Sequence, residues 1–346
     1  MLTDKQIKEI KLHLEKAQNP LFLFDNDPDG LCSFLLLQRY IERGKGFPIK
    51  SFPELKADYI RKINELNADY VFILDKPVIE KEFWEEIHKI NIPVVWIDHH
   101  GIQGETPDFV SYYDPVLNNP STNEPVTALC YQITQRKKDI WLAVIGCISD
   151  AFLPDFYKDF QEKYPDLAVD AKKPFDVLYK SEIGRLGKIM GNGLKDKTTN
   201  VIAMLKFLMK VKNPYEALEE TSQNYLMHKR FNEVEQKYQN ILEKAKKVAE
   251  SSEKILFFKY AGDLSMSGEL SNELRYNFPD KIIVVAHIKP DKVNLSIRGK
   301  KIREKYLKII KSIESARGGG HEDAVGGQMS FGDLEKFRKK FEEEFG

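Results

Sequence analysis

The stretch LFLFDNDPDG, residues 21–30, joins an apolar run to a dense group of carboxylates. Four consecutive large apolar residues predict a short strand that is buried on both of its faces. The runs YVFIL at 70–74 and VVWI at 94–97 have the same character, and helical patterns at 31–43 and 54–66 lie between the runs. Strands that alternate with helices predict an α/β fold with a doubly wound parallel sheet.

Acidic or histidine side chains follow the apolar runs of the first 150 residues. They are Asp25, Asp27, Asp29, Asp75, Asp98, His99, His100 and Asp150. The carboxyl ends of neighbouring parallel strands face one crevice, so we expect these side chains to meet there. Taken singly, each aspartate can also be read as a helix cap or a turn residue. Taken together, they predict a site for two divalent cations, because carboxylate oxygens are hard ligands that suit Mn²⁺ or Mg²⁺.

A calcium-binding EF-hand loop is a competing interpretation of the DNDPDG motif. Such a loop carries a glutamate at its twelfth position and follows a helix. In this chain Leu36 stands at the twelfth position, and the motif follows a predicted strand. The sequence therefore argues against a calcium sensor.

Composition narrows the class of protein. The 346 residues are 42% hydrophobic and 31% charged, which predicts about two globular domains and excludes a disordered or collagen-like chain. No apolar run approaches the ~18 residues that a membrane span needs, and residues 1–16 predict an amphipathic helix rather than a signal peptide. The three cysteines are far apart, which argues against a disulfide framework. We therefore expect a cytoplasmic protein with no membrane partner.

The second half of the chain predicts a smaller α/β unit behind a helical segment. The polar, glycine-containing stretch 191–200 is expected to be a linker, and a long charged helix is expected over 214–250. Strands and helices of the last unit are predicted at 255–260, 267–277, 281–288, 292–299, 301–315 and 331–344. Residues 1–160 are net acidic and the remainder net basic, which suits a metal-binding part followed by an anion-binding part. A solvated helix face explains the basic charges equally well.

This ordered set of motifs resembles the DHH phosphoesterase superfamily. The match comprises DNDPDG, the strand-end Asp75, the triplet Asp98-His99-His100 and the aspartate that ends WLAVIGCISD. LSIRG at 295–299 and ARGGGHEDAVGGQM at 316–329, with its glycine-rich loop, are similar to the DHHA1-type substrate-binding domain that follows many DHH domains. The implied domains are a DHH catalytic domain over 1–185, a helical linker over 186–250 and a DHHA1-type domain over 251–346.

The resemblance implies roles for individual side chains. The implied metal ligands are Asp25, Asp27, Asp29, Asp75, His99 and Asp150. Asp75 would bridge both cations, His100 would contact phosphate, and Asp98 would orient the site. For Asp25, a supporting role beside the ligands is the alternative. The implied substrate-binding residues of the last domain are Arg298, Gly318, Gly319, Gly320 and His321, together with His100.

The resemblance also implies an activity. Pyrophosphatase-type members carry a histidine where this chain has Leu23, so the sequence sides with the nuclease-like members. It is most similar to the short archaeal RecJ-like nucleases. This implies an exonuclease in which two divalent cations, Mn²⁺ before Mg²⁺, activate water against the ends of single-stranded DNA or RNA. For the short archaeal members the direction leans to 3′→5′, and the setting would be DNA replication or repair, with a protein partner from those processes or a second copy of the chain.

Two alternatives stay open. The same chemistry suits a phosphodiesterase of very short oligonucleotides, of 3′-phosphoadenosine phosphate (pAp) or of cyclic dinucleotides. The fold also suits a non-catalytic scaffold in a replication or repair complex. The complete set of implied metal ligands argues against the scaffold, because scaffold relatives have lost theirs.

Overall fold

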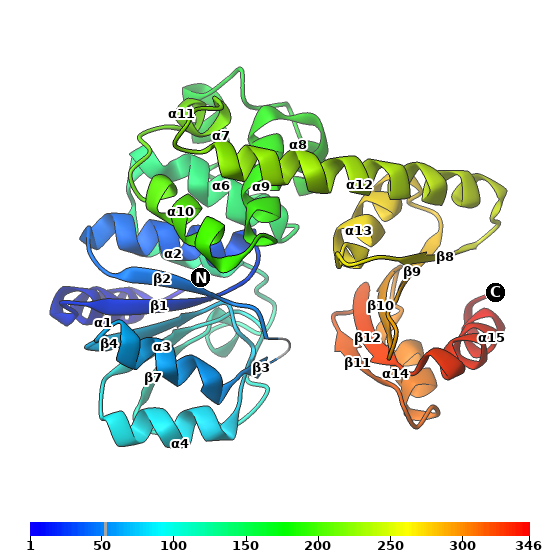
Figure 1. The fold of residues 1–346 in the computed structure, drawn as a ribbon, viewed down its shortest axis with the longest axis horizontal. Helices are drawn as coiled ribbons and strands as arrows, with labels where there is room; N and C mark the ends of the chain where they lie inside the picture. Colours follow the sequence, from blue (N-terminus) through cyan, green and yellow to red (C-terminus); the bar gives the residue numbers. More distant parts are fainter. Residues whose placement is uncertain (52–53) are drawn as a thin grey trace. The chain divides into compact units, whose positions relative to one another are not determined.

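The chain divides into two compact units. The computed structural model describes residues 1–51 and 54–346, and the units are Met1–Asn232 and Glu233–Gly346 (Figure 1). Helix α12 (Tyr225–Ser251) runs from the first unit into the second. No helix within the described residues is both long enough and apolar enough to cross a membrane.

A five-stranded parallel sheet forms the centre of the first unit, in the order β2-β1-β4-β6-β7. Its strands are β2 (Lys45–Ile49), β1 (Pro20–Asp25), β4 (Tyr70–Leu74), β6 (Val94–Ile97) and β7 (Val110–Tyr113). All four neighbouring pairs are parallel, which confirms the predicted doubly wound sheet. A separate pair, β3 (Glu54–Leu55) and β5 (Val78–Ile79), forms a small parallel ladder.

Both faces of this sheet are covered by helices, which explains why the strands are apolar at every position. In β1, Phe22 and Phe24 join the core cluster that includes α1 and α2, while Leu21 and Leu23 join the cluster that includes α3 and α4. The helices of the unit are α1 (Asp4–Lys16), α2 (Pro28–Ile41), α3 (Ile60–Glu65), α4 (Lys81–Ile90), α5 (Val126–Thr134), α6 (Ile140–Ser149), α7 (Tyr157–Lys163), α8 (Pro174–Lys180), α9 (Glu182–Leu194), α10 (Thr198–Leu208) and α11 (Pro214–Leu218).

The polar stretch 191–200 is mostly helical, so it is not an irregular segment between helices. Helix α9 continues to Leu194, and α10 begins at Thr198. Glycine is used here for close packing, because a Cβ at Gly193 would lie 2.4 Å from the Met204 sulfur. Composition alone predicts that such glycines interrupt a helix, whereas here Gly193 lies within α9 and allows close contact with Met204.

The second unit contains a mixed five-stranded sheet in the order β11-β12-β10-β9-β8. Its strands are β8 (Ile255–Ala261), β9 (Ile282–Ile288), β10 (Val293–Arg298), β11 (Arg317–Gly320) and β12 (Ala324–Met329). Strands β8 and β9 are parallel, and the other pairs are antiparallel. Helix α13 (Ser267–Asn277) and part of α12 cover one face, and α14 (Arg303–Lys311) and α15 (Leu334–Phe345) cover the other.

The glycine run at 318–320 belongs to edge strand β11, so its prediction as a loop is wrong. Gly318 pairs with Gly327 of β12. A Cβ on either of these two residues would lie 2.3 Å from the Tyr306 hydroxyl oxygen. The glycines thus let α14 approach the sheet, a packing reason that the sequence pattern does not display.

The turn from β1 into α2 fixes the DNDPDG motif. Asp27 is the N-cap of α2, and its side chain accepts a hydrogen bond from the Gly30 backbone N–H at 2.9 Å. Pro28 follows in the first turn, where a missing N–H costs nothing. A Cβ at Gly30 would lie 2.5 Å from the Asp25 carbonyl oxygen, so only glycine fits without moving the backbone of the motif.

We therefore expect Gly30→Ala to destabilise the first unit by about 1–3 kcal/mol, the usual cost of overpacking against backbone. Thermal unfolding followed by circular dichroism measures this loss. Gly104→Ala is the matched control, because a Cβ at Gly104 meets no atom within 4 Å. Equal melting temperatures for the two variants would contradict the close approach described for Gly30.

Candidate metal centre

Strand register brings four aspartates to one edge of the first sheet. Phe24 pairs with Leu74, Leu74 with Ile97, and Ile97 with Tyr113. The residue after each of these four is an aspartate, and the set is Asp25, Asp75, Asp98 and Asp114. The parallel sheet therefore gathers these carboxylates at its carboxyl edge, as the sequence predicts for the first three.

Asp29 reaches this edge from the first turn of α2 and is held by the start of α5. Its two carboxylate oxygens accept hydrogen bonds from the backbone N–H groups of Val126 (3.0 Å) and Thr127 (2.7 Å). The residue before α5 is Pro125, which offers no side-chain cap, so the carboxylate of Asp29 satisfies amides that would otherwise lack a partner. Asp29 is 2% exposed and is fixed in place by backbone donors.

The two histidines point to different carboxylates. His99 Nε2 lies 3.4 Å from Asp75 Oδ1 and 3.7 Å from Asp150 Oδ2. His100 Nδ1 lies 2.9 Å from Asp98 Oδ1, and the His100 backbone N–H donates to Asp98 Oδ2 at 3.2 Å. Asp98 is fully buried, so the His100 ring is held by a carboxylate of the protein interior.

Asp114 supports the loop that follows the histidines. One carboxylate oxygen accepts from the Gly101 N–H at 2.9 Å and the Tyr112 hydroxyl at 2.8 Å, and the other accepts from the Val116 N–H at 2.7 Å. Sequence reasoning assigned no role to Asp114. The signal that could have found it is its position directly after the apolar-and-aromatic run VSYY, equivalent to the other strand-end aspartates.

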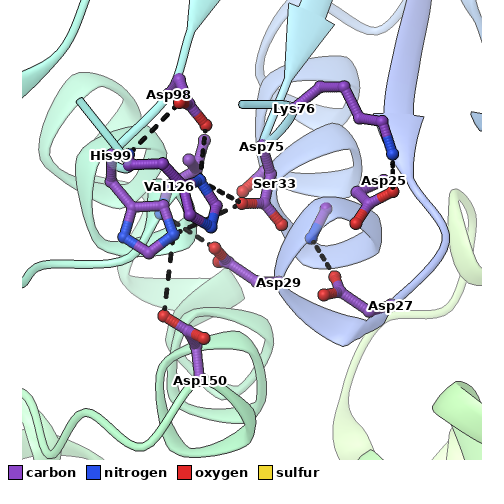
Figure 2. A network of polar contacts seen from close by, with 12 residues as sticks. Asp25, Asp27, Asp29, Ser33, Asp75, Lys76, Asp98, His99, Val126 and Asp150 are labelled. Atoms are coloured by element: carbon purple, nitrogen blue, oxygen red, sulfur yellow. Dashed lines mark hydrogen bonds and ion pairs between the residues drawn. The ribbon is translucent and has the colours of Figure 1, made fainter. Parts of the chain in front are cut away.

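Among the residues that the structure describes, three sets of potential ligand atoms occur, and the atoms within each set lie within 4.8 Å of one another. We name them the aspartate group (Asp25, Asp27, Asp75), the histidine group (Asp29, His99, Asp150) and the middle group (Asp75, His99, His100). Asp75 and His99 each belong to two groups, so the sets are contiguous (Figure 2). The structure thus brings together every residue that the sequence predicts as a metal ligand. His100 also enters a ligand set, in addition to its contact with Asp98.

Burial and mutual repulsion perturb the acids of this cluster. Desolvation by the surrounding protein, reinforced by the charges of Asp25 and Asp29, raises the pKa of Asp27 to about 8, although part of its side chain is exposed to solvent. Burial also raises the pKa of Asp75 well above its usual value, and the charges of Asp29 and Asp27 add to this effect. The pKa of Asp150 rises to about 6 through desolvation, against the opposing charge of His99. Asp27 and Asp150 are exposed to solvent, whereas Asp29 and Asp75 are buried, and carboxylates this close together are stable as anions only beside cations.

The pKa values of the two imidazoles are also raised, but by neighbouring charges rather than by burial. Burial alone would lower the pKa of His100, but its hydrogen bond and charge interaction with Asp98 raise that pKa to about 9. For His99, the charges of Asp150 and Asp29 likewise outweigh burial, and the pKa is raised. The donor set of carboxylates with imidazole nitrogen fits a hard or borderline divalent cation such as Mn²⁺ or Mg²⁺.

Apart from His100, the substrate-binding residues that the resemblance implies lie in the second unit. Arg298 ends β10 and pairs in register with Ala324, so the hairpin turn that begins at His321 lies at the same end of the sheet. Arg298 Nε donates to Asn272 Oδ1 at 2.6 Å, which ties it to α13. Gly319 has open space around its Cα, whereas Gly318 packs against Tyr306. The structure therefore brings Arg298, Gly320 and His321 to one end of this sheet and places Gly318 in a packing role.

Comparison with known proteins follows the same two-part division. The DHH family, N-terminal domain, matches residues 21–148, and the DHHA1 domain matches residues 253–346. No curated protein sequence matches the chain significantly.

Solved structures share this fold at low sequence identity. RecJ in complex with Mn²⁺ from Thermus thermophilus aligns with a TM-score of 0.68 at 15% identity, over 98% of this chain and 53% of that one. The DHH domain of a protein described as a member of a family of ribosomal proteins aligns with a TM-score of 0.70 at 15% identity, over 98% and 89% of the two chains. CDC45 from Entamoeba histolytica aligns with a TM-score of 0.52 at 9% identity, over 99% of each chain.

The chain spans about half the length of the Thermus thermophilus RecJ that it matches. The two domain models together cover more than half of the chain, and they match its two parts in the order predicted from the motifs. This confirms the resemblance drawn from DNDPDG, the DHH triplet and the glycine-rich C-terminal stretch. The chain therefore carries a DHH-family N-terminal domain within its first unit and a DHHA1 domain within its second.

Proposed function

We propose that the chain is a metal-dependent, RecJ-like phosphodiesterase that releases nucleotides from the ends of single-stranded DNA or RNA. The observation that carries this proposal is the contiguity of the aspartate, middle and histidine groups, which share Asp75 and His99. Two neighbouring sets of hard ligands with common members are what a two-cation phosphoesterase site requires. Mn²⁺ is the ion we propose first and Mg²⁺ second, since RecJ from Thermus thermophilus has been solved with each.

Two bound divalent cations would polarise the phosphate and activate a water molecule near neutral pH. The protein's own contribution is to hold the ligands rigid. Backbone amides fix Asp29, and the left-handed backbone of Asp75 (φ 58°) sets that carboxylate at the strand end. Asp98 keeps the His100 ring in one orientation, which a group that contacts phosphate needs. In the proposed assignment the aspartate and histidine groups would each hold one cation, and Asp75, which lies 3.4 Å from His99 Nε2, would contribute to both.

Recognition of the nucleic acid is assigned to the second unit. Arg298 carries a guanidinium suited to a phosphate, and the exposed glycine edge of β11 lets backbone amides approach a ligand. The basic residues of α14, such as Lys305 and Lys308, extend the positive surface of this unit. We further propose the 3′→5′ direction and a role in DNA replication or repair with a protein partner, on the family resemblance given above.

A second candidate is a phosphodiesterase of very short substrates: di- to pentanucleotides, pAp or cyclic dinucleotides. It would use the same three ligand groups as the first candidate. The chemistry proposed for the metal centre is identical in both candidates, so only substrate length separates them.

The decisive experiment is hydrolysis of DNA and RNA ladders, from dinucleotides to about thirty nucleotides, labelled in turn at the 5′ and 3′ ends. We expect Mn²⁺-dependent, stepwise shortening of the long members. Asp75→Asn should lower the rate about a hundredfold or more, because it weakens a ligand shared by two groups. Exposed Asp58→Asn is the matched control and should keep the wild-type rate. Cleavage restricted to the shortest members would select the second candidate, and full activity after chelation would reject both.

Arg298→Ala should raise the KM for a single-stranded oligonucleotide about tenfold, with a smaller change in kcat, because it removes one charge-assisted contact to phosphate. Steady-state kinetics at several substrate concentrations separates the two constants. Lys336→Ala removes an exposed positive charge from the same unit and serves as control. A KM unchanged from wild type would exclude Arg298 from substrate binding.

Cation binding should depend on pH in a direction set by Asp27. In the cation-free protein the pKa of Asp27 is about 8, above its value in the unfolded chain. Protonation of Asp27 therefore stabilises the folded protein at low pH, and this stabilisation is lost as the pH rises through about 8. Cation binding needs the carboxylate and strengthens over the same range. The increase in melting temperature caused by Mn²⁺ should therefore be larger at about pH 8.5 than at about pH 6, and on the order of 5 °C at the higher pH.

Asp27→Asn is the matched control for this measurement, because asparagine caps a helix as well as aspartate does. The variant should fold and should show a smaller Mn²⁺ effect that depends less steeply on pH than in the wild-type protein, because Asp75 and Asp150 still titrate. A Mn²⁺ effect that shrinks as the pH rises in the wild-type protein would contradict the assignment of Asp27 as a ligand.

A further inference from the structure

Lys76 places a positive charge inside the candidate metal centre. Its Nζ atom lies 2.8 Å from Asp25 Oδ1 and 2.9 Å from the Ser51 carbonyl oxygen. The Lys76 side chain is 1% exposed, whereas that of Asp25 is 25% exposed. A buried ammonium persists only when it is paired and hydrogen-bonded, and Asp25 provides the pairing (Figure 2).

The backbone holds this lysine firmly. It follows Asp75, whose left-handed conformation turns the chain at the end of β4. The indole N–H of Trp96, from the neighbouring strand β6, donates to the Lys76 carbonyl oxygen at 2.9 Å. Because the side chain is buried, Lys76 is not placed to bind substrate directly. It is instead a positioning residue that acts through Asp25.

The supports of the aspartate and histidine groups differ in charge. In the aspartate group, one oxygen of Asp25 already contacts a full positive charge. In the histidine group, Asp29 is held by neutral backbone amides, and Asp150 pairs with an imidazole that can itself become a ligand. A divalent cation in the aspartate group would therefore sit close to an ammonium and be repelled by it, with only weak screening because Lys76 is buried.

We propose that Lys76 makes the two cation sites unequal, lowering the affinity of the aspartate group for a divalent cation and leaving the histidine group as the tighter site. This inference rests on the proposed function, since it requires both groups to bind cations. It gives Lys76 a role in the order in which the sites fill. The aspartate group fills only at higher concentrations of the free ion.

Mn²⁺ binding to the full chain tests this directly, without any measurement of activity. Electron paramagnetic resonance of free Mn²⁺ during a titration gives the number of sites and their dissociation constants. The wild-type chain should show a tight and a weak site. Lys76→Met should tighten the weak site at least about tenfold, because it removes the repelling charge. Lys76→Arg should keep the wild-type inequality, and exposed Lys56→Met is the control for loss of a lysine elsewhere.

Assignment of the two sites uses Asp150→Asn, which should abolish the tight site and leave the weak one. Lys76→Gln carries the same expectation as Lys76→Met and replaces it if the methionine variant does not fold. Two equal sites in the wild-type chain would overturn the inference, as would a weak site that the neutral Lys76 variants leave unchanged. Absence of any Mn²⁺ binding would instead reject the proposed function, so the two failures are distinguishable.

Discussion

Repulsion among buried carboxylates at one edge of a parallel sheet is the constraint on which the rest of the first unit depends. The register of β1, β4, β6 and β7 places their carboxylates side by side. The pairing among these strands ends one residue before an aspartate on each strand, and the four strand ends are level. An unpaired carboxylate in such a place is costly. The surrounding structure supplies donors to each one, and the type of donor differs from one aspartate to the next.

Those donors come from segments far apart in sequence. Helix α5 directs its first backbone amides at Asp29, although nearly a hundred residues separate them. The contact continues into the core, because a Cβ at Gly146 of α6 would lie 2.1 Å from the hydroxyl oxygen of Thr127. A change in the packing of α5 on α6 would therefore shift the carboxylate of Asp29, because the backbone amides at the start of α5 hold it. Rigid support of this kind is what a catalytic ligand set requires.

The sequence was sufficient for the features that depend on local pattern. Runs buried on both faces predicted β1, β4 and β6, and the acids that follow them predicted the metal centre, because parallel strand ends must converge. It was insufficient where tertiary contact overrides local preference. The glycines of α9 and β11 look like breakers but serve close packing against Met204 and Tyr306. Asp114 and Lys76 were missed because their partners, Gly101 and Asp25, are identified only once the loops are placed.

The difference between neutral and charged support has a consequence for the whole centre. Backbone amides stabilise Asp29 while leaving its formal charge available to a cation, so the histidine group keeps its full attraction for a divalent ion. Lys76 stabilises Asp25 with a full positive charge, so the attraction of the aspartate group for a divalent ion is reduced. A single buried lysine thus offsets the charge of Asp25 in the cation-free centre and, in the proposal above, opposes a divalent cation at the same end.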